Sequence, residues 1–218
     1  MIQRPPNPDE LPLGDRLVNV ALEILMEEGI EALTLRSVAR HAGVSHGAPA
    51  RHFRSLADLL AEVAAAGFRT LSEAMAKAEV AVAPNSPPMA RLAAAARAYV
   101  DCAVANPDLF ALMFRVDALD VENESFSRDA PAAFETLLEH VRNAQAAGWH
   151  PERDTMKLAG SMWVTVHGLA TLWAKGGYPR VIPGASLDDA LDSILDLVDD
   201  PSCVVASPTV SRPPGESQ

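Results

Sequence analysis

Cysteine, aromatic residues and long apolar runs are all scarce in this 218-residue sequence, and each shortage excludes a class of protein. Cys102 and Cys203 are too few and too far apart for a disulfide framework or a zinc site, so we expect no metal and no cofactor. No apolar run approaches the ~18 residues that a membrane-spanning helix needs. The first residues carry prolines and acids in place of an apolar signal peptide, so we expect a cytoplasmic protein without a membrane partner.

The scarcity of aromatic residues and the abundance of alanine favour helices over strands. Apolar residues recur at helical spacing, as at Leu17, Ala21, Ile24 and Leu25, and Gly29 ends that pattern. We therefore predict an all-α fold with about nine helices. The expected helices cover 13–28, 35–42, 45–53, 56 to beyond 75, 88 to beyond 103, 109–116, a stretch through 134–141 that ends at 148, 154–175, and 187–199; residues 117–130 are expected to form a polar loop.

Acidic residues are absent from residues 34–56, although the whole chain carries a net charge of −11. This stretch contains four arginines and three histidines, so its formal charge is +4 and the remainder carries −15. A compact basic patch on an acidic protein is typical of a site that binds a polyanion. A chance gap in the acids is the alternative that charge alone leaves open.

Residues 34–53, TLRSVARHAGVSHGAPARHF, have the pattern of a helix-turn-helix. Gly43 permits the tight turn between two short helices, and Val44 anchors this turn to the core. The outer face of the second helix carries small or polar side chains, which lets its backbone approach a groove of DNA. Pro49 lies inside this predicted helix; with Ser45 as the cap, it removes only the first intrahelical hydrogen bond.

The motif A-x-x-A-G-V-S-x-G-A-x-x-R-H-F at residues 39–53 resembles the DNA-binding domain of the TetR/AcrR family of regulators, and the similarity covers residues 17–64. The resemblance implies that the helix after the turn enters the major groove of double-stranded DNA. It also implies a homodimer on a palindromic operator, and a regulator that is not an enzyme. The residues expected at or near the DNA are Thr34, Arg36, Ser45, His46, Gly47, Ala48, Arg51, His52 and Arg54.

Two positions depart from the family pattern. Ala50 stands where the family usually has tyrosine, and Leu56 stands where it usually has lysine. Both usual residues contact the DNA backbone, so the departures leave the affinity for DNA open.

The C-terminal half adds Trp163, His167 and Gly168, which are similar to the Trp-His-Gly motif of one type of ligand-binding domain in such regulators. Trp163 and His167 share a helix face. A mostly apolar cavity with one or two polar groups is typical of a small-molecule site, so we predict a small, largely apolar effector. Ordinary core packing is the alternative for each residue alone. The expected ligand-binding residues are Tyr99, Phe110, Met113, Phe114, Trp163 and His167.

The domain organisation follows from these motifs. We predict a flexible arm over 1–12, a DNA-binding domain over 13–56, a ligand-binding and dimerisation domain over 57–199, and a disordered tail over 200–218. The dimer interface is expected on the last two long helices, at Leu172, Leu187, Leu191, Ile194, Leu195 and Val198.

The resulting hypothesis is a ligand-responsive transcriptional repressor. One rival is a helical hydrolase or lyase that uses His167, although no nucleophile or acid–base pair stands at motif spacing. The other is an interaction or small-molecule-binding protein whose degenerate helix-turn-helix binds DNA weakly, which the departures at Ala50 and Leu56 motivate.

Overall fold

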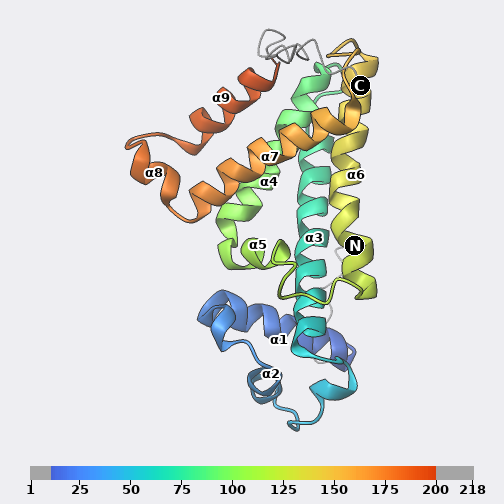
Figure 1. The fold of residues 1–218 in the computed structure, drawn as a ribbon, viewed down its shortest axis with the longest axis vertical. Helices are drawn as coiled ribbons and strands as arrows, with labels where there is room; N and C mark the ends of the chain where they lie inside the picture. Colours follow the sequence, from blue (N-terminus) through green and yellow to red (C-terminus); the bar gives the residue numbers. More distant parts are fainter. Residues whose placement is uncertain (1–10, 200–218) are drawn as a thin grey trace, which may run out of the picture.

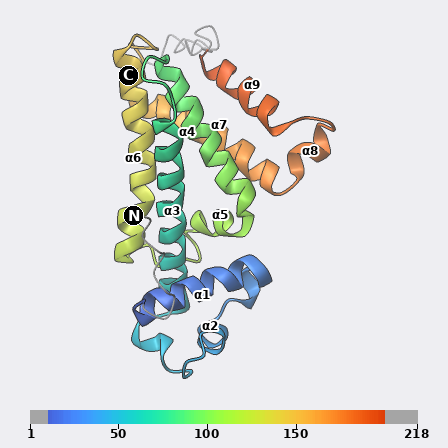
Figure 2. The same ribbon diagram turned by 180° about the vertical axis from the view of Figure 1, so that it is seen from behind.

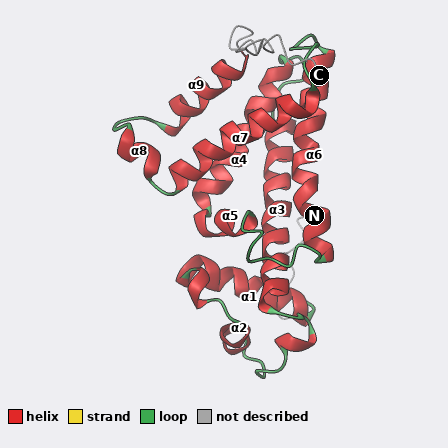
Figure 3. Cartoon of the chain, in the orientation of Figure 1, coloured by secondary structure: helices red, strands yellow, loops and turns green. Residues whose placement is uncertain are grey.

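The computed structural model describes residues 11–199, and this part of the chain is helical throughout, without a strand (Figure 3). The predicted all-α fold is therefore confirmed. The predicted tail, and the predicted arm apart from Leu11 and Pro12, lie outside the described residues. The elements are α1 (Leu13–Glu28), η2 (Ile30–Ala32), α2 (Leu35–His41), η3 (Pro49–Arg51), α3 (Leu56–Val80), α4 (Pro88–Ala105), α5 (Pro107–Met113), α6 (Glu124–Ala146), α7 (Thr155–Ala174), α8 (Gly177–Val181) and α9 (Leu187–Asp199), where η marks a short 3₁₀ helix.

The N-terminal unit is built from α1, α2 and the first turns of α3. The apolar stripe of α1 is buried as its spacing predicts, and Gly29 follows the helix with φ +81°. Thr34 caps α2 in a reciprocal arrangement, because its hydroxyl accepts from the backbone N–H of Ser37 while Ser37 Oγ accepts from the N–H of Thr34. Gly43 forms the turn with φ +66°, where a side chain would strain the backbone.

The larger unit is organised around α3, a 25-residue helix that starts at the Ser55 cap in the N-terminal unit and runs through the larger unit beside α6 (Figure 1). Helices α4 and α6 pack along α3, and α7 crosses α4 and α6. Helix α9 packs on α7 and α4, at the far end of the chain from α2 (Figures 1 and 2). Because α3 belongs to both units, a displacement of its N-terminal turns moves the N-terminal unit directly.

Three boundaries differ from the expectation. Helix α6 begins at Glu124, inside the predicted loop over 117–130, because Asn123 Oδ1 caps it by accepting from the N–H of Phe126 and Pro131 is tolerated within the helix. Helix α5 covers Pro107–Met113 instead of 109–116. The short helix α8 was not expected. No helix in residues 11–199 is both long enough and apolar enough to cross a membrane.

Candidate functional site

The segment predicted to be the recognition helix is not an α-helix here. Residues 45–53 form a turn followed by the 3₁₀ helix η3. The N–H of Ala48 donates to the Ser45 carbonyl over 2.9 Å, and the N–H of His52 donates to the Pro49 carbonyl over 2.9 Å. Pro49 has no N–H to donate to Ser45, so the tighter i→i+3 pattern replaces the α-helical one. The expectation of limited damage from Pro49 was wrong.

The outer surface of this segment is nevertheless open. The residues predicted to meet DNA belong to α2 and to the turn that follows it, and these elements lie at the end of the molecule opposite α9 (Figure 1). Arg36 and Arg51 form no ion pair with any residue of 11–199, so their charges are available to a polyanion. The exposed members of the predicted set are Thr34, Arg36, Ser45, His46, Gly47, Arg51, His52 and Arg54, while Ala48 is half-buried.

Arg54 has a different environment from the other predicted DNA contacts. Its guanidinium donates from Nη2 to Asp120 Oδ2 at 2.8 Å and lies 3.5 Å from Asp58 Oδ2 through Nε. Two carboxylates of the chain itself therefore lie beside this guanidinium, which stays 70% exposed. Its role at a phosphate stays a prediction, and a phosphate would compete with Asp120 for the same Nη2.

Asp58 is the buried centre of a polar network at the start of α3. Its carboxylate accepts from the backbone N–H of Arg54 at 2.8 Å and from Asn123 Nδ2 at 2.8 Å. Asn123 Nδ2 also donates to Glu62 Oε1 at 3.0 Å. Burial by itself would raise the pKa of Asp58, but the hydrogen bonds from Asn123 and Arg54 outweigh it and hold the pKa below its usual value. The network therefore keeps a carboxylate charged where α3 meets the loop before α6.

A cavity of about 620 Å³ lies within the larger unit. Apolar side chains form most of its wall, and its polar groups are few, as in a site for a small apolar molecule. Helices α3, α4, α6 and α7 contribute most of the lining, with Met113 at the end of α5 and Val116 from the loop that follows. The lining residues are Phe68, Leu71, Met75, Leu92, Ala95, Ala96, Tyr99, Met113, Phe114, Val116, Phe126, Ala130, Ala133, Phe134, Thr136, Leu137, His140, Met162, Trp163, Val166 and His167.

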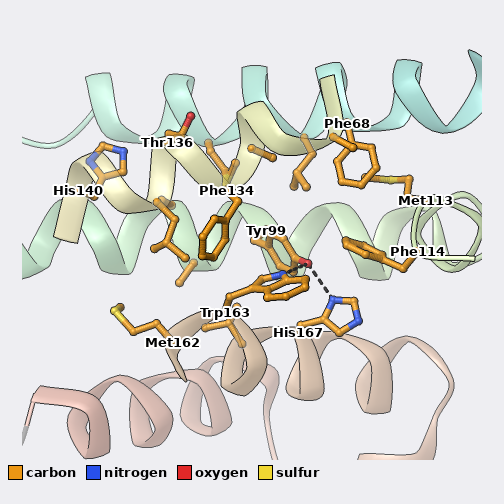
Figure 4. Close-up of a pocket in the computed structure, with 18 of the residues that line it drawn as sticks. Phe68, Tyr99, Met113, Phe114, Phe134, Thr136, His140, Met162, Trp163 and His167 are labelled. Atoms are coloured by element: carbon orange, nitrogen blue, oxygen red, sulfur yellow. Dashed lines mark hydrogen bonds between the residues drawn. The ribbon is translucent and has the colours of Figure 1, made fainter. Parts of the chain in front are cut away.

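A hydrogen-bonded relay of Trp163, Tyr99 and His167 forms the polar group in this wall (Figure 4). The indole Nε1–H can only donate, and it lies 3.3 Å from Tyr99 Oη. Among residues 11–199 the only acceptor within reach of the Tyr99 hydroxyl is His167 Nδ1, at 2.8 Å, so the arrangement that satisfies this hydroxyl has Tyr99 donating to Nδ1 and the histidine proton on Nε2. Burial raises the pKa of Tyr99 and lowers the pKa of His167, so both groups are neutral near pH 7.

The cavity brings together five of the six residues predicted to bind ligand: Tyr99, Met113, Phe114, Trp163 and His167. Phe110 does not line it; its ring packs behind, with centroids 5.4 Å from Tyr99 and 5.3 Å from His167. The contributions of α3 and α6 were missed, including those of Phe68, Phe126, Phe134 and His140. Their helical spacing indicates a buried face, but only the packing of the helices shows that this face borders a cavity.

Two family descriptions match the chain. "Bacterial regulatory proteins, tetR family" matches residues 17–63, which contain the helix-turn-helix. "Tetracyclin repressor-like, C-terminal domain" matches residues 92–198, which contain most of the cavity wall. The chain belongs to the TetR family. It is accordingly a DNA-binding transcriptional regulator, as its motif predicts, whereas the Trp-His-Gly subtype stays a prediction.

Solved structures share this TetR fold. A protein of unknown function from Rhodococcus sp. RHA1 is 34% identical, with a TM-score of 0.76 over 87% of this chain and 94% of that one. The fatty acid degradation regulator FadR from Bacillus halodurans is 14% identical, with a TM-score of 0.68 over 88% and 97%. The TetR-family regulator PfmR from Thermus thermophilus is 22% identical, with a TM-score of 0.60 over 85% and 97%. No curated protein matches the sequence.

The residues predicted for the dimer interface of this TetR-family chain divide into two groups. Leu191 and Leu195 are buried within the protomer itself, where α9 packs on α4 and α7, so a partner is not needed to cover them. Leu172 is 53% exposed on the outer face of α7. Leu187, Ile194 and Val198 are half-buried against the same cores.

Within residues 11–199, no group of three or more histidine, cysteine or acidic side chains is placed to hold a metal ion. Residues 45–53, called the reading segment below, contain two histidines, His46 and His52, and both are exposed.

Proposed function

We propose that this TetR-family regulator is a repressor that acts as a cytoplasmic homodimer on a palindromic operator and is released by a small, largely apolar effector. The cavity is the observation that carries the proposal. Its apolar wall surrounds a neutral polar relay, which suits an uncharged or weakly polar molecule. It also borders α3, the helix whose N-terminal turns belong to the DNA-binding unit.

The loop between α5 and α6 is the proposed route from effector to DNA. Phe114 precedes this loop and Phe126 follows it; both line the cavity and pack edge-on against Phe68 of α3, with centroids 5.4 and 6.0 Å away. The loop is fixed to the start of α3, because the N–H of Asp120 donates to the Ala57 carbonyl over 3.1 Å. A molecule that separates these aromatic rings therefore displaces the loop and the α3 turns bonded to it.

The response is a shift between two arrangements of the DNA-binding unit. The two reading segments of a dimer must lie roughly 34 Å apart to enter successive major grooves. An effector changes that spacing only by as much as its affinity differs between the two arrangements. The contacts of Arg54 with Asp58 and Asp120 lie between the α5–α6 loop and the reading segment, so they transmit a displacement of the loop to that segment.

The dimer is proposed to form on the outer faces of α7 and α9. Met156, Val164 and Leu172 are each more than half exposed on α7, and Leu197 is 60% exposed on α9. Gly160 and Gly168 lie between them on α7 with open space beyond, which permits close approach of a second helix. Two helices from each copy form a four-helix interface.

The test is a titration of labelled operator DNA, taken from the region upstream of the gene, followed by fluorescence anisotropy. We expect specific binding that weakens steeply with salt, as phosphate contacts release counterions. Leu172→Glu should give monomers that bind the operator weakly, whereas Met26→Glu, an exposed substitution on α1 outside the interface, should leave the dimer intact. A monomeric wild type in light scattering at micromolar concentration would contradict the dimer proposal.

Three observations favour the alternative of a weakly DNA-binding interaction protein. The reading segment is a 3₁₀ turn, and the Arg54 guanidinium is paired with the carboxylates of Asp58 and Asp120. In addition, Ala50 and Leu56 lack the side chains that usually contact phosphate in the family. The same titration separates the two functions, because equal and weak binding to operator and scrambled duplex would support the alternative.

A further inference from the structure

A buried pair of polar side chains that the relay does not use, Glu79 and His140, lies at the end of the cavity opposite His167, and of the two only His140 lines the cavity. His140 lines the cavity from α6, and its Nε2 lies 2.5 Å from Glu79 Oε1 of α3. The two side chains are only 13% and 15% exposed. Neither of the two facing atoms makes an aligned hydrogen bond with any residue of 11–199. The pair is thus removed from water without full compensation.

Such a buried pair adds little to the stability of the fold. Removing a carboxylate and an imidazole from water costs several kcal/mol, and well-packed apolar residues are often as stable or more stable in the same place. The surrounding wall is apolar, with Met75 one turn before Glu79 and Leu137 one turn before His140. A polar pair held at this cost inside an apolar wall points to a ligand group that it recognises.

The pair and the relay lie at opposite ends of the cavity. Figure 4 shows His140 and Thr136 at one end and His167 with Phe114 at the other. Helices α3 and α6 run side by side, with Phe68 against Phe126 near the relay and Glu79 against His140 at the far end. The eleven residue steps from 68 to 79 span about 16 Å of helix. A 620 Å³ cavity of that length is elongated.

The two ends differ in the polar atoms that they leave free. In the relay, His167 Nδ1 accepts from Tyr99, so its Nε2–H is a donor without a partner in residues 11–199. At the far end the Glu79 carboxylate lies against His140 Nε2. His140 Nδ1 bonds to no described residue, and a hydroxyl, which both donates and accepts, matches that nitrogen whether or not it carries a proton. The negative charge of Glu79 also disfavours an anionic ligand group there.

We propose that the effector is an elongated, mainly apolar molecule with a hydrogen-bond acceptor at the end near His167 and a hydroxyl group at the end near His140. This inference rests on the proposed effector role of the cavity, and it adds the polarity of both ends. A carbonyl or carboxylate oxygen at one end accepts from His167 Nε2–H, and a hydroxyl at the other end bonds to His140 Nδ1.

The experiment measures the affinity of the full chain for three ten-carbon probes by isothermal titration calorimetry: decanoate, 10-hydroxydecanoate and decanedioate. We expect 10-hydroxydecanoate to bind about tenfold more tightly than decanoate, the effect of one good hydrogen bond. Decanedioate should bind more weakly than 10-hydroxydecanoate, because its second carboxylate meets Glu79.

Two variants assign the effect to the pair. In His140→Phe the advantage of the hydroxyl should disappear, and in Glu79→Gln the disadvantage of decanedioate should decrease. Glu139→Gln is the matched control, since it removes the same charge from an exposed position on α6 next to His140 and should preserve both ratios. Cooperative thermal unfolding shows that each variant is folded.

The outcomes separate the inference from the function on which it rests. Equal affinity for decanoate and 10-hydroxydecanoate would overturn the inference and leave the effector cavity in place. A hydroxyl preference that persists in His140→Phe would also overturn it. Failure of all three carboxylate probes while the uncharged probe decan-1-ol binds would overturn the inference and leave the apolar effector in place, whereas failure of decan-1-ol as well would overturn the proposed apolar effector.

Discussion

Replacement of Asp58 by alanine tests the network that joins the DNA-binding unit to the cavity. The substitution removes two charge-assisted hydrogen bonds of 2.8 Å, from the backbone N–H of Arg54 and from Asn123 Nδ2. Each such bond contributes roughly 1.5–3 kcal/mol. Asn123 keeps its bond to Glu62, and Arg54 is exposed enough to bind water, so the lower end applies to both. We therefore expect a loss of about 3 kcal/mol in the free energy of unfolding.

Urea denaturation followed by circular dichroism at equal protein concentration measures this loss, and the melting temperature should decrease by roughly 9 °C. Asp120→Ala is the matched control. It removes the exposed partner of the Arg54 side chain, whose ion pair is worth less than about 1 kcal/mol because Arg54 is 70% exposed. A loss below about 1 kcal/mol in Asp58→Ala, or equal losses in the two variants, would refute the assignment of Asp58 as the centre of the network.

Three further changes have definite expected outcomes. Gly67→Ala should destabilise the chain by about 1 kcal/mol in urea, since its Cβ would lie 2.7 Å from Met113 Sδ and the crowding exceeds the gain in helix propensity; a stabilised variant would contradict this. Arg36→Ala should flatten the log-affinity against log-salt slope by about one unit per monomer, and Arg54→Ala by less, because Arg54 is already paired; equal slopes would count against it. The pKa of His167 is lowered by burial, so as pH falls below about 6.5 the unfolded chain binds a proton on this residue before the folded chain does. Wild type should therefore lose more free energy of unfolding between about pH 7.5 and 5 than His167→Gln. Parallel curves of unfolding free energy against pH for the two proteins would reject the neutral relay.

The DNA-binding unit was predictable from local sequence, because its helix caps and glycine turn depend on neighbouring residues. Thr34 with Ser37 and the turn at Gly43 are as expected. The conformation of the reading segment was not predictable in this way. Pro49, at the fourth position after the Ser45 cap, favours a 3₁₀ turn whose energy is close to that of an α-helix. The ion pair of Arg54 was not predictable for a different reason: its partner Asp120 lies 66 residues away, and no local pattern connects the two.

The cavity was predictable only in part. Trp163 and His167 were predicted from a motif, and Tyr99, Met113 and Phe114 from apolar helix faces, so five of its residues were found by type and spacing. The wall formed by α3 and α6 depends on how two helices far apart in the sequence pack against each other. His140 and Glu79 had no signal in the sequence, because a single histidine and a single glutamate on separate helices acquire meaning only from their contact.

The 3₁₀ reading segment has a consequence for the range of DNA sequences that this regulator can recognise. Its backbone hydrogen bonds are mostly of the i→i+3 type, with one i→i+4 bond from the N–H of Phe53 to the Pro49 carbonyl. Pro49 and Phe53 are buried and anchor the segment to the N-terminal unit, while His46, Gly47 and Arg51 stay exposed. A 3₁₀ turn has about three residues per turn and rises about 2.0 Å per residue, against about 3.6 residues and 1.5 Å in an α-helix. The exposed side chains of this segment are therefore spaced differently from those of an α-helical reading segment, and they face a different spacing of base steps.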